Sequence, residues 1–413
     1  MTTSAASPAV QPRPPARAGR ATALMVFALT VNLVPLASFA AVLPEIARAW
    51  HLSASAAGWI GGVYFAGYAA AVPVLASLTD HIDGRRVFAA SSLLAAAAGF
   101  AFAGCAEGLW TALVLRFLSG VALAGVHMPG LKLLAERTFG RARARGSAVY
   151  AASYMLGIAG SFFVAGAVDA VLGWRATFAI GGVAPLSALA AVALLPPAVE
   201  AVPAAGFAFD FRPLLRNRAL MAYVLAFAGN LWEVSAVWAW FVAYLAWTLG
   251  LPHHRLQIPA PAVISGLAAL AGFPASLLVA ELALRWGPRA IVATCLASIA
   301  ILLGLAASAG GPALVSLPLL IAAQIAAPAD ASALAAGAVA VADPARRGAA
   351  LALYACAGYV AACVGPVAVG FALDAFGGAG SPSGWRAAFI AMALGSTAAA
   401  IAMRAARGAR NWN

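Results

Sequence analysis

Charged residues are scarce in this sequence. They make up 9% of its 413 residues, and hydrophobic residues make up 64%, whereas an average soluble domain is about 25% charged and about 45–50% apolar. So few charges cannot cover the surface of a soluble protein, and so many apolar side chains need a lipid bilayer around them. The composition therefore excludes a soluble globular protein and indicates an integral membrane protein.

Cysteine and histidine are also few. The four cysteines form no CxxC pair, and His127 is the only histidine inside an apolar run. The sequence therefore predicts no disulfide framework, no metal site and no cluster of nucleophile and base such as an enzyme would need. No GxxxxGK[ST] motif occurs, so we expect no nucleotide to drive the protein directly and no cofactor to be bound.

Lysine is nearly absent, yet the formal net charge is +12. The positive charge comes from arginine, and Lys132 is the only lysine. A basic protein can bind nucleic acid, but these arginines lie between apolar runs, as they do in the cytoplasmic loops of membrane proteins. We therefore expect no nucleic-acid partner.

Apolar runs of about 20 residues recur along the chain, and this is the length that an α-helix needs to cross a bilayer. The alternation typical of strands is absent. The pattern predicts an all-α membrane protein with transmembrane helices at 21–43, 55–78, 87–106, 109–135, 147–171, 175–196, 219–247, 259–283, 289–309, 313–341, 348–374 and 385–404.

The longest polar connection divides these twelve helices six and six. Residues 197–218 contain Pro and Gly and are expected to be a cytoplasmic linker between a six-helix bundle at 21–196 and another at 219–404. We expect a disordered cytoplasmic tail at 1–20 and a second tail at 405–413. This orientation places most arginines in the cytoplasm, as the positive-inside rule requires. The sequence thus predicts a monomeric, multi-pass protein of a bacterial-type inner membrane.

The second half of the chain repeats the first. The sequence GWRATF opens the sixth predicted span at 173–178, and GWRAAF opens the twelfth at 384–389. Each follows an aspartate at the end of the preceding span, Asp169 and Asp374. Many secondary transporters are built from two repeated halves, with the binding site between them near the bilayer midplane.

Two motifs resemble those of the major facilitator superfamily. The family has a motif G-x-x-x-D-R-x-G-R-R after the second span, and residues 76–86 read ASLTDHIDGRR with one residue inserted. A second family motif, R-x-x-x-G, is present in the fourth span at 116–120. The first motif matches at Asp80, Gly84, Arg85 and Arg86.

The resemblance implies two pseudo-symmetric six-helix bundles that rock about a central site and expose it to each side of the membrane in turn. In the family, the aspartate of the first motif is thought to meet the start of the eleventh span, so Asp80, Gly84, Arg85 and Arg86 would form a conformational latch. The arginine of the second motif, here Arg116, is associated with proton coupling. The alternative for the first motif is simple anchoring by positive charge.

Polar residues deep in an apolar span are functional candidates, because an ionisable group costs at least about 2.5–3.5 kcal/mol at the centre of a membrane helix. In the family, the first, fourth, seventh and tenth spans line the central cavity. The candidates fall in those spans: Asn32, Arg116, His127, Asn230, Trp232, Glu233, Gln324 and Asp330.

The two halves offer opposite charges. Arg116 and His127 belong to the first half, and Glu233 and Asp330 belong to the second. Glu233 lies midway along its span and suits a proton carrier or a substrate contact, and the alternative is a structural partner for Arg116. A zwitterionic or carboxylate-bearing substrate could bridge the halves, and so could a salt bridge that breaks during transport. Trp232 could stack on a substrate or merely pack.

These residues predict a secondary transporter that moves a small organic solute by alternating access, with protons as the coupling ion. The arginine motif favours efflux. The fifth span lacks the proline of many family antiporters, which favours uptake of an organic anion or zwitterion by symport. A membrane sensor or scaffold without transport is the alternative of another class.

Overall fold

The computed structural model describes residues 15–196, 212–251, 259–343 and 346–408, and every regular element in them is a helix. The expected tails and linker lie largely outside these residues. The helices are α1 (Pro15–Leu33), α2 (Ser38–Ala49), α3 (Ala54–Leu78), α4 (Gly84–Cys105), α5 (Leu109–Ala135), α6 (Gly140–Ala193), α7 (Arg212–Leu215), α8 (Arg218–Leu249), α9 (Pro261–Trp286), α10 (Pro288–Ser308), α11 (Ala313–Ala326), α12 (Ala331–Val341), α13 (Arg347–Ala375) and α14 (Pro382–Gly408).

The helices confirm the prediction of an all-α membrane protein. In the described residues, 11 helical segments are long and apolar enough to span a membrane. One of them, Gly140–Ala193, is 54 residues long and contains a sharp break at Gly173, where φ is 77° and ψ is 173°. Only glycine adopts this backbone conformation readily. The segment therefore holds two spans, the fifth and the sixth, and the total is twelve.

Two of the spans are interrupted near the middle of their length. The first span consists of α1 and α2 with a non-helical segment at 34–37 between them, and the tenth consists of α11 and α12 with a non-helical segment at 327–330. Each break frees backbone carbonyl groups that need partners inside the bilayer. The sequence predicts both of these spans as single helices, and the breaks matter because they lie beside the polar candidates.

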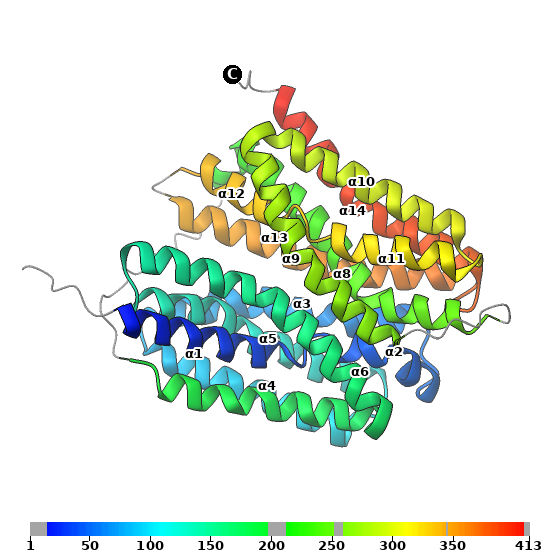
Figure 1. Cartoon of the computed structure of the whole chain (residues 1–413), viewed down its shortest axis with the longest axis horizontal. Helices are drawn as coiled ribbons and strands as arrows, with labels where there is room; N and C mark the ends of the chain where they lie inside the picture. Colours follow the sequence, from blue (N-terminus) through cyan, green and yellow to red (C-terminus); the bar gives the residue numbers. More distant parts are fainter. Residues whose placement is uncertain (1–14, 197–211, 252–258, 344–345, 409–413) are drawn as a thin grey trace, which may run out of the picture.

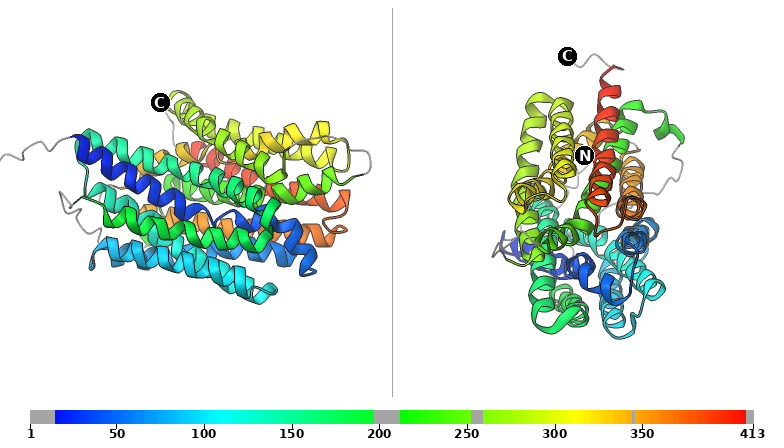
Figure 2. Two further views of the ribbon diagram at one scale, coloured as in Figure 1. Left: turned by 60° about the horizontal axis from the view of Figure 1, so that its bottom comes forward. Right: turned by 90° about the vertical axis from the view of Figure 1, so that its right-hand side faces the viewer.

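The helices form two bundles that lie against each other (Figure 1). The helices α1 to α6 make up one bundle, here called the N-half, and α8 to α14 make up the other, the C-half, as the views in Figure 2 also show. Inside the N-half, α3 packs on α5, α1 packs on α6, and α4 packs on both α5 and α6. Inside the C-half, α8 packs on α13 and α14. We call the end of the molecule where α1 begins and α14 ends the terminal face, and the other end the opposite face.

The halves meet chiefly through α3 with α13 and through α6 with α9. Small residues allow the close approach of α3 and α13: a Cβ atom on Gly58 or Gly62 would collide with the backbone of Pro366 or Cys363. The contact of α6 with α9 also uses a small pair, Gly166 against Ala262. These contacts belong to the part of each helix nearer the opposite face, so the described structure is held closed there.

Candidate functional site

Arg116 fills the break in the first span. Its guanidinium group donates hydrogen bonds to the carbonyl oxygens of Pro35 (3.1 Å) and Leu36 (3.0 Å), and its Cζ atom lies 4.5 Å from the centre of the Tyr64 ring. Arg116 is 5% exposed and has no carboxylate partner among the described residues. The arrangement therefore leaves a net positive charge in the interior of the membrane protein, held by carbonyl dipoles and one aromatic face.

A small cavity adjoins Arg116 at the boundary between the halves. Phe65 on α3 and Trp238 on α8 are among the residues that line it, so both halves contribute walls. Its volume is about 30 Å³, which is room for a water molecule or two but not for an organic solute. The site is therefore closed around Arg116 in this conformation, and a solute could enter only after the halves move apart.

His127 lies in a cluster of tyrosines farther along α5. The hydroxyl group of Tyr68 lies 3.1 Å from Nδ1 of His127, and the Tyr154 ring lies 5.2 Å from the imidazole. Tyr359, from α13, packs against Tyr68 in a tilted arrangement with ring centroids 3.9 Å apart. His127 is thus an interfacial residue, joined through Tyr68 to a ring of the other half.

Glu233 occupies a polar pocket inside the C-half. Oε1 accepts a hydrogen bond from the hydroxyl group of Ser298 on α10 (2.6 Å), and Oε2 accepts one from Ser396 on α14. Glu233 is 1% exposed, and no basic side chain contacts it in the part of the chain that the structure describes. A charge in such a place is costly, so the geometry suits a carboxyl group that carries a proton.

Asp330 forms a second polar pocket at the break in the tenth span. Oδ1 accepts a hydrogen bond from Asn230 (2.5 Å), which also donates to the carbonyl oxygen of Ala327 (2.7 Å). The thiol of Cys295 lies 3.6 Å from the other carboxyl oxygen. Asn230 and Asp330 are both buried. The amide of Asn230 therefore ties the freed carbonyl of the break to the carboxyl group.

The other three candidates bond within their own half. Asn32 donates to Ala28 in its own helix (2.8 Å). The indole nitrogen of Trp232 donates to the carbonyl oxygen of Ala391 on α14 (3.0 Å). Gln324 donates to the hydroxyl group of Ser265 on α9 (3.0 Å). Each interaction accounts for the residue structurally in this conformation.

The structure brings the candidates together in two separate groups. Arg116 and His127 lie at the boundary of the halves, whereas Glu233 and Asp330 bond to residues of α10 and α14 inside the C-half. No ion pair joins the two groups among the described residues. A direct bridge between the charges of the two halves is therefore not formed in this conformation.

The residues of the predicted latch bond within the N-half. Asp80 forms an ion pair with Lys132, which also donates to the carbonyl oxygen of Thr79 (2.9 Å). Arg85 donates to the carbonyl oxygens of Leu195 and Pro196 (both 2.9 Å) at the end of α6. Gly84 begins α4, and Arg86 beside it is exposed. Asp80 therefore holds α3 to α5 here rather than to α13.

Arg137 shares the environment of Arg85 at the terminal face. It donates to the carbonyl oxygen of Pro196 (2.9 Å). Burial and the neighbouring charge of Arg85 lower the pKa of Arg137 from its ordinary value. Two guanidinium groups thus converge on the end of α6, where carbonyl oxygens and the negative end of the helix dipole stabilise positive charge.

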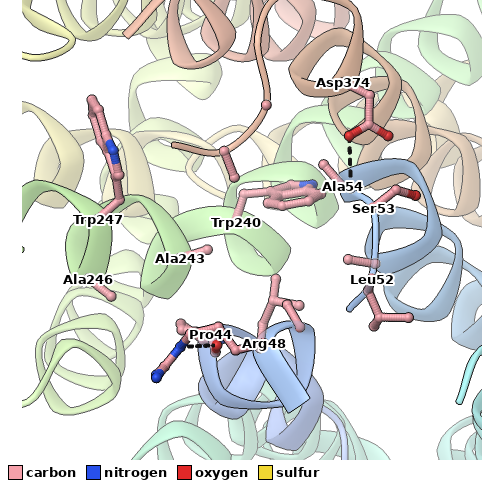
Figure 3. Close-up of a pocket in the computed structure, with 15 residues that line it drawn as sticks. Pro44, Arg48, Leu52, Ser53, Ala54, Trp240, Ala243, Ala246, Trp247 and Asp374 are labelled. Atoms are coloured by element: carbon pink, nitrogen blue, oxygen red, sulfur yellow. Dashed lines mark hydrogen bonds between the residues drawn. The ribbon is translucent and has the colours of Figure 1, made fainter. Parts of the chain in front are cut away.

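An open cavity of about 630 Å³ lies at the opposite face, between α2 and α3 of the N-half and α8 and α13 of the C-half (Figure 3). Arg48 on α2, Trp240 and Trp247 on α8, and Asp374 on α13 contribute to its walls. The rest of the lining is mostly small and apolar. Asp374 is among the residues that line this cavity.

Several residues of these groups were not candidates from the sequence. Ser298, Ser396 and Tyr359 are among them, and so is Ser161, whose hydroxyl group donates to the carbonyl oxygen of Val34 (2.5 Å) and accepts from the amide of Ala37 (2.9 Å) at the first break. Serine and tyrosine are common in membrane helices, and no spacing marks these four. Only their three-dimensional contacts with Glu233, Tyr68 and the broken helix identify them.

The sequence profile of the Major Facilitator Superfamily matches residues 21–327. Among curated proteins, no sequence matches the chain significantly. Among solved structures, the chain is similar to a bacterial homolog of the human lysosomal transporter Spinster in an inward-facing and occupied conformation, with a TM-score of 0.81 and 14% identity over 97% of this chain and 100% of that one. It is also similar to the nucleoside transporter NupG, with a TM-score of 0.74 and 11% identity over 94% of this chain and 98% of that one. At these identities the likeness shows a shared fold.

Proposed function

Because the chain belongs to the major facilitator superfamily of secondary transporters, we propose that it moves a small organic solute with an anionic group across the membrane, coupled to protons. The family is non-enzymatic, and the chain is a multi-pass membrane protein. The substrate class, the coupling ion and the direction are the parts that we propose.

The observation that carries the proposal is the buried, uncompensated charge of Arg116 at the boundary of the halves. A guanidinium group binds carboxylate or phosphate in a planar, two-pronged geometry. When the halves separate, a solute that brings its own negative charge would replace the missing counter-ion. The aromatic walls of the cavity at Phe65, Phe162 and Trp238 suit a solute that also has an apolar or aromatic part.

Glu233 and Asp330 are proposed as the proton sites. Both carboxyl groups are buried without a basic partner among the described residues, and both hold hydrogen bonds that can rearrange when α8 or the broken tenth span moves. Asn230 would transmit such a movement, because it bonds to the break and to Asp330 at once. His127 is a second candidate, since it links the N-half to Tyr359 through Tyr68.

The proposed cycle rocks the N-half at 21–196 against the C-half at 219–404, with 197–218 as the link. Asp80 and its neighbours would latch the terminal face when that face closes. Efflux by proton antiport is our first choice, and uptake of an organic anion or zwitterion by symport is the second. We propose a monomer in a bacterial-type inner membrane with both termini in the cytoplasm, which makes the terminal face the cytoplasmic one.

Thermal unfolding of the purified protein in detergent tests the substrate class. Organic anions, zwitterions and lipophilic cations would be screened separately for a rise in melting temperature. A ligand at a hundred times its dissociation constant stabilises a protein by about 2.7 kcal/mol. We expect anions or zwitterions to stabilise the wild type, and the stabilisation to disappear in Arg116→Ala but not in Arg175→Ala, which removes an exposed arginine outside the site.

Two outcomes would redirect the proposal. If lipophilic cations stabilise the protein and Glu233→Gln abolishes the effect, the protein exports cations and the role given to Arg116 is wrong. If a ligand binds but no solute moves in proteoliposomes under any proton gradient, and Glu233→Gln and Asp330→Asn leave cellular function intact, the sensor or scaffold alternative holds.

A further inference from the structure

We propose that Asp374 is a latch residue of the transport cycle: its carboxylate holds the opposite face closed by binding the start of α3, and it alternates in this role with Asp80 at the terminal face. The inference rests on alternating access, but it does not depend on the identity of the solute or of the coupling ion.

The contact of Asp374 joins the two halves directly. Asp374 lies in the last turn of α13, and one carboxyl oxygen accepts a hydrogen bond from the backbone amide of Ala54 (2.9 Å), as Figure 3 shows. The other carboxyl oxygen accepts one from the amide of Ser55 (2.8 Å). These are the first two residues of α3. A carboxylate at a helix N-terminus is stabilised both by the free amide groups and by the positive end of the helix dipole. One side chain of the C-half therefore caps a helix of the N-half.

Asp374 binds two of the four amide groups at the start of α3 that have no partner within the helix. The first four N–H groups of a helix have no partner within the helix. In α3 these are the amides of residues 53 to 56, because the amide of Ala57 makes the first bond inside the helix, to the backbone oxygen of Ser53 (3.1 Å). The side chain of Ser53 accepts from Ala56 (3.1 Å). The amides of Ala54 and Ser55 are bonded by Asp374 alone among the described residues. Separation of the halves at the opposite face would leave both of these amides to water.

The register of α3 and α13 makes Asp80 the counterpart of Asp374. Three contacts set the register: Gly58 with Pro366, Gly62 with Cys363, and Tyr68 with Tyr359. As the residue number rises along α3, the number of its partner on α13 falls. The two helices are thus antiparallel, and the end of α3 comes opposite the start of α13 at Arg347. Asp80 stands beyond the end of α3, as Asp374 stands at the end of α13.

The two aspartates occupy opposite states in this structure. Asp374 is bound across the halves, whereas Asp80 is paired with Lys132 in its own half. The start of α13 carries arginines at 346 and 347, and its first turn has no acidic residue, so it would attract Asp80 when the terminal face closes. Since one helix pair supplies both contacts, a tilt that forms one would break the other.

The experiment measures distances across each face in the detergent-purified full chain by pulsed electron paramagnetic resonance. The opposite face would carry labels at the native Cys105 and at Ala379→Cys, with the other three cysteines replaced by alanine. The terminal face would carry labels at Ile82→Cys and Arg346→Cys, with all four native cysteines replaced. All four positions are exposed, and each pair joins the two halves.

Asp374→Asn keeps the size of the side chain and removes its charge. We expect the ratio of closed to open molecules at the opposite face to fall about two- to fivefold, as the loss of a charge at a helix terminus predicts, and the terminal-face distance to shorten in the same proportion. Asp374→Glu should keep part of the closed population. Asp80→Asn should shift both distances the other way, and the double variant should return toward the wild type.

Glu107→Gln is the matched control, because Glu107 is an exposed acid at the opposite face that has no described contact with the C-half. If Asp374→Asn lowers the melting temperature but moves neither distance beyond this control, Asp374 is only structural and the inference is wrong. If both distances move but no solute is ever transported, the latch stands and the proposed function fails.

Discussion

Arg116 is the residue on which most of the central geometry depends. Replacement by alanine would leave the carbonyl oxygens of Pro35 and Leu36 buried without a donor, and each such loss costs about 1–3 kcal/mol. We therefore expect Arg116→Ala to lower the free energy of unfolding by about that amount or more, with a smaller loss in Arg116→Lys. Reversible unfolding in mixed detergent micelles would measure the difference.

Arg175 provides a closely matched comparison for Arg116. It also bonds a carbonyl oxygen, that of Ala103 (2.8 Å), and lies over an aromatic ring, that of Trp174 (4.6 Å), but it is exposed at the opposite face. Exposed contacts of this kind contribute little, so Arg175→Ala should change the free energy of unfolding by less than about 0.5 kcal/mol. Equal losses in the two variants would show that the burial of Arg116 has no special weight.

Glu233 allows a test of proton coupling, because one substitution removes one protonatable group. Glu233→Gln preserves the shape of the side chain and the bonds to Ser298 and Ser396 in altered form, but it cannot release or bind a proton. With the ligand found by thermal unfolding, we expect proton-gradient-driven transport in proteoliposomes to fall at least tenfold, the effect of about 1.4 kcal/mol. Exchange of labelled for unlabelled ligand across the membrane should persist, because exchange needs no net proton movement.

The exposed acid Glu281, paired with Arg285 on the surface of α9 (3.3 Å), is the control for this substitution. Glu281→Gln should leave both kinds of transport unchanged. If Glu233→Gln removes exchange as well as gradient-driven transport, Glu233 acts in solute binding or in folding rather than in coupling.

At the scale of the element, the sequence predicted where the helices lie but not how they are interrupted or rotated. Proline alone does not reveal the breaks: Pro35 and Pro328 lie in them, but Pro73 and Pro129 lie within continuous helices. What distinguishes the break at 34–37 is that Arg116 and Ser161, from distant helices, bond the freed backbone groups. Such long-range partners leave no local signal.

The orientation of α8 about its own axis could not be predicted from the sequence either. Glu233 could be placed at the middle of its span from the length of the apolar run. The direction in which its carboxyl group points could not be inferred, because buried residues lie on all sides of α8. In the structure the group faces Ser298 and Ser396 inside the C-half. A helix that packs on every side lacks the one-sided pattern from which orientation is read.

The close packing of α3 on α13 makes a prediction about these two helices. A Cβ atom on Gly62 would collide with the backbone of Cys363, whereas one on the adjacent Gly61 would lie 3.7 Å from its nearest neighbour. We expect Gly62→Ala to push α13 away and to raise the rate at which a maleimide modifies Cys363 severalfold, in protein whose other cysteines are replaced by alanine. Gly61→Ala should leave that rate close to the wild-type value, and a similar rise in both variants would contradict the packing argument.

At the scale of the whole molecule, the repeat in the sequence predicted two halves, because GWRATF and GWRAAF mark equivalent points in the N-half and the C-half. The repeat does not predict which face of the molecule is closed. The two repeat-related aspartates behave differently: Asp374 caps α3, while Asp169 is placed against Glu45 in its own half. The halves are thus alike in their helices and unlike in their polar contacts, as a molecule needs if one face is to be closed while the other is not.

The orientation of the whole molecule in the membrane is testable through the same division into faces. Twelve spans place both ends of the chain on one side, and the arginines gathered at the terminal face should keep that face in the cytoplasm. A phosphatase that is active only outside the cytoplasm should therefore be active when fused after Gly108 or Gly310 at the opposite face, and inactive when fused after Asp83 at the terminal face. A fluorescent protein that folds only in the cytoplasm should give the reverse pattern. If the phosphatase is active after Asp83, the molecule has the opposite orientation in the membrane. The direction of transport that we propose as efflux would then be uptake.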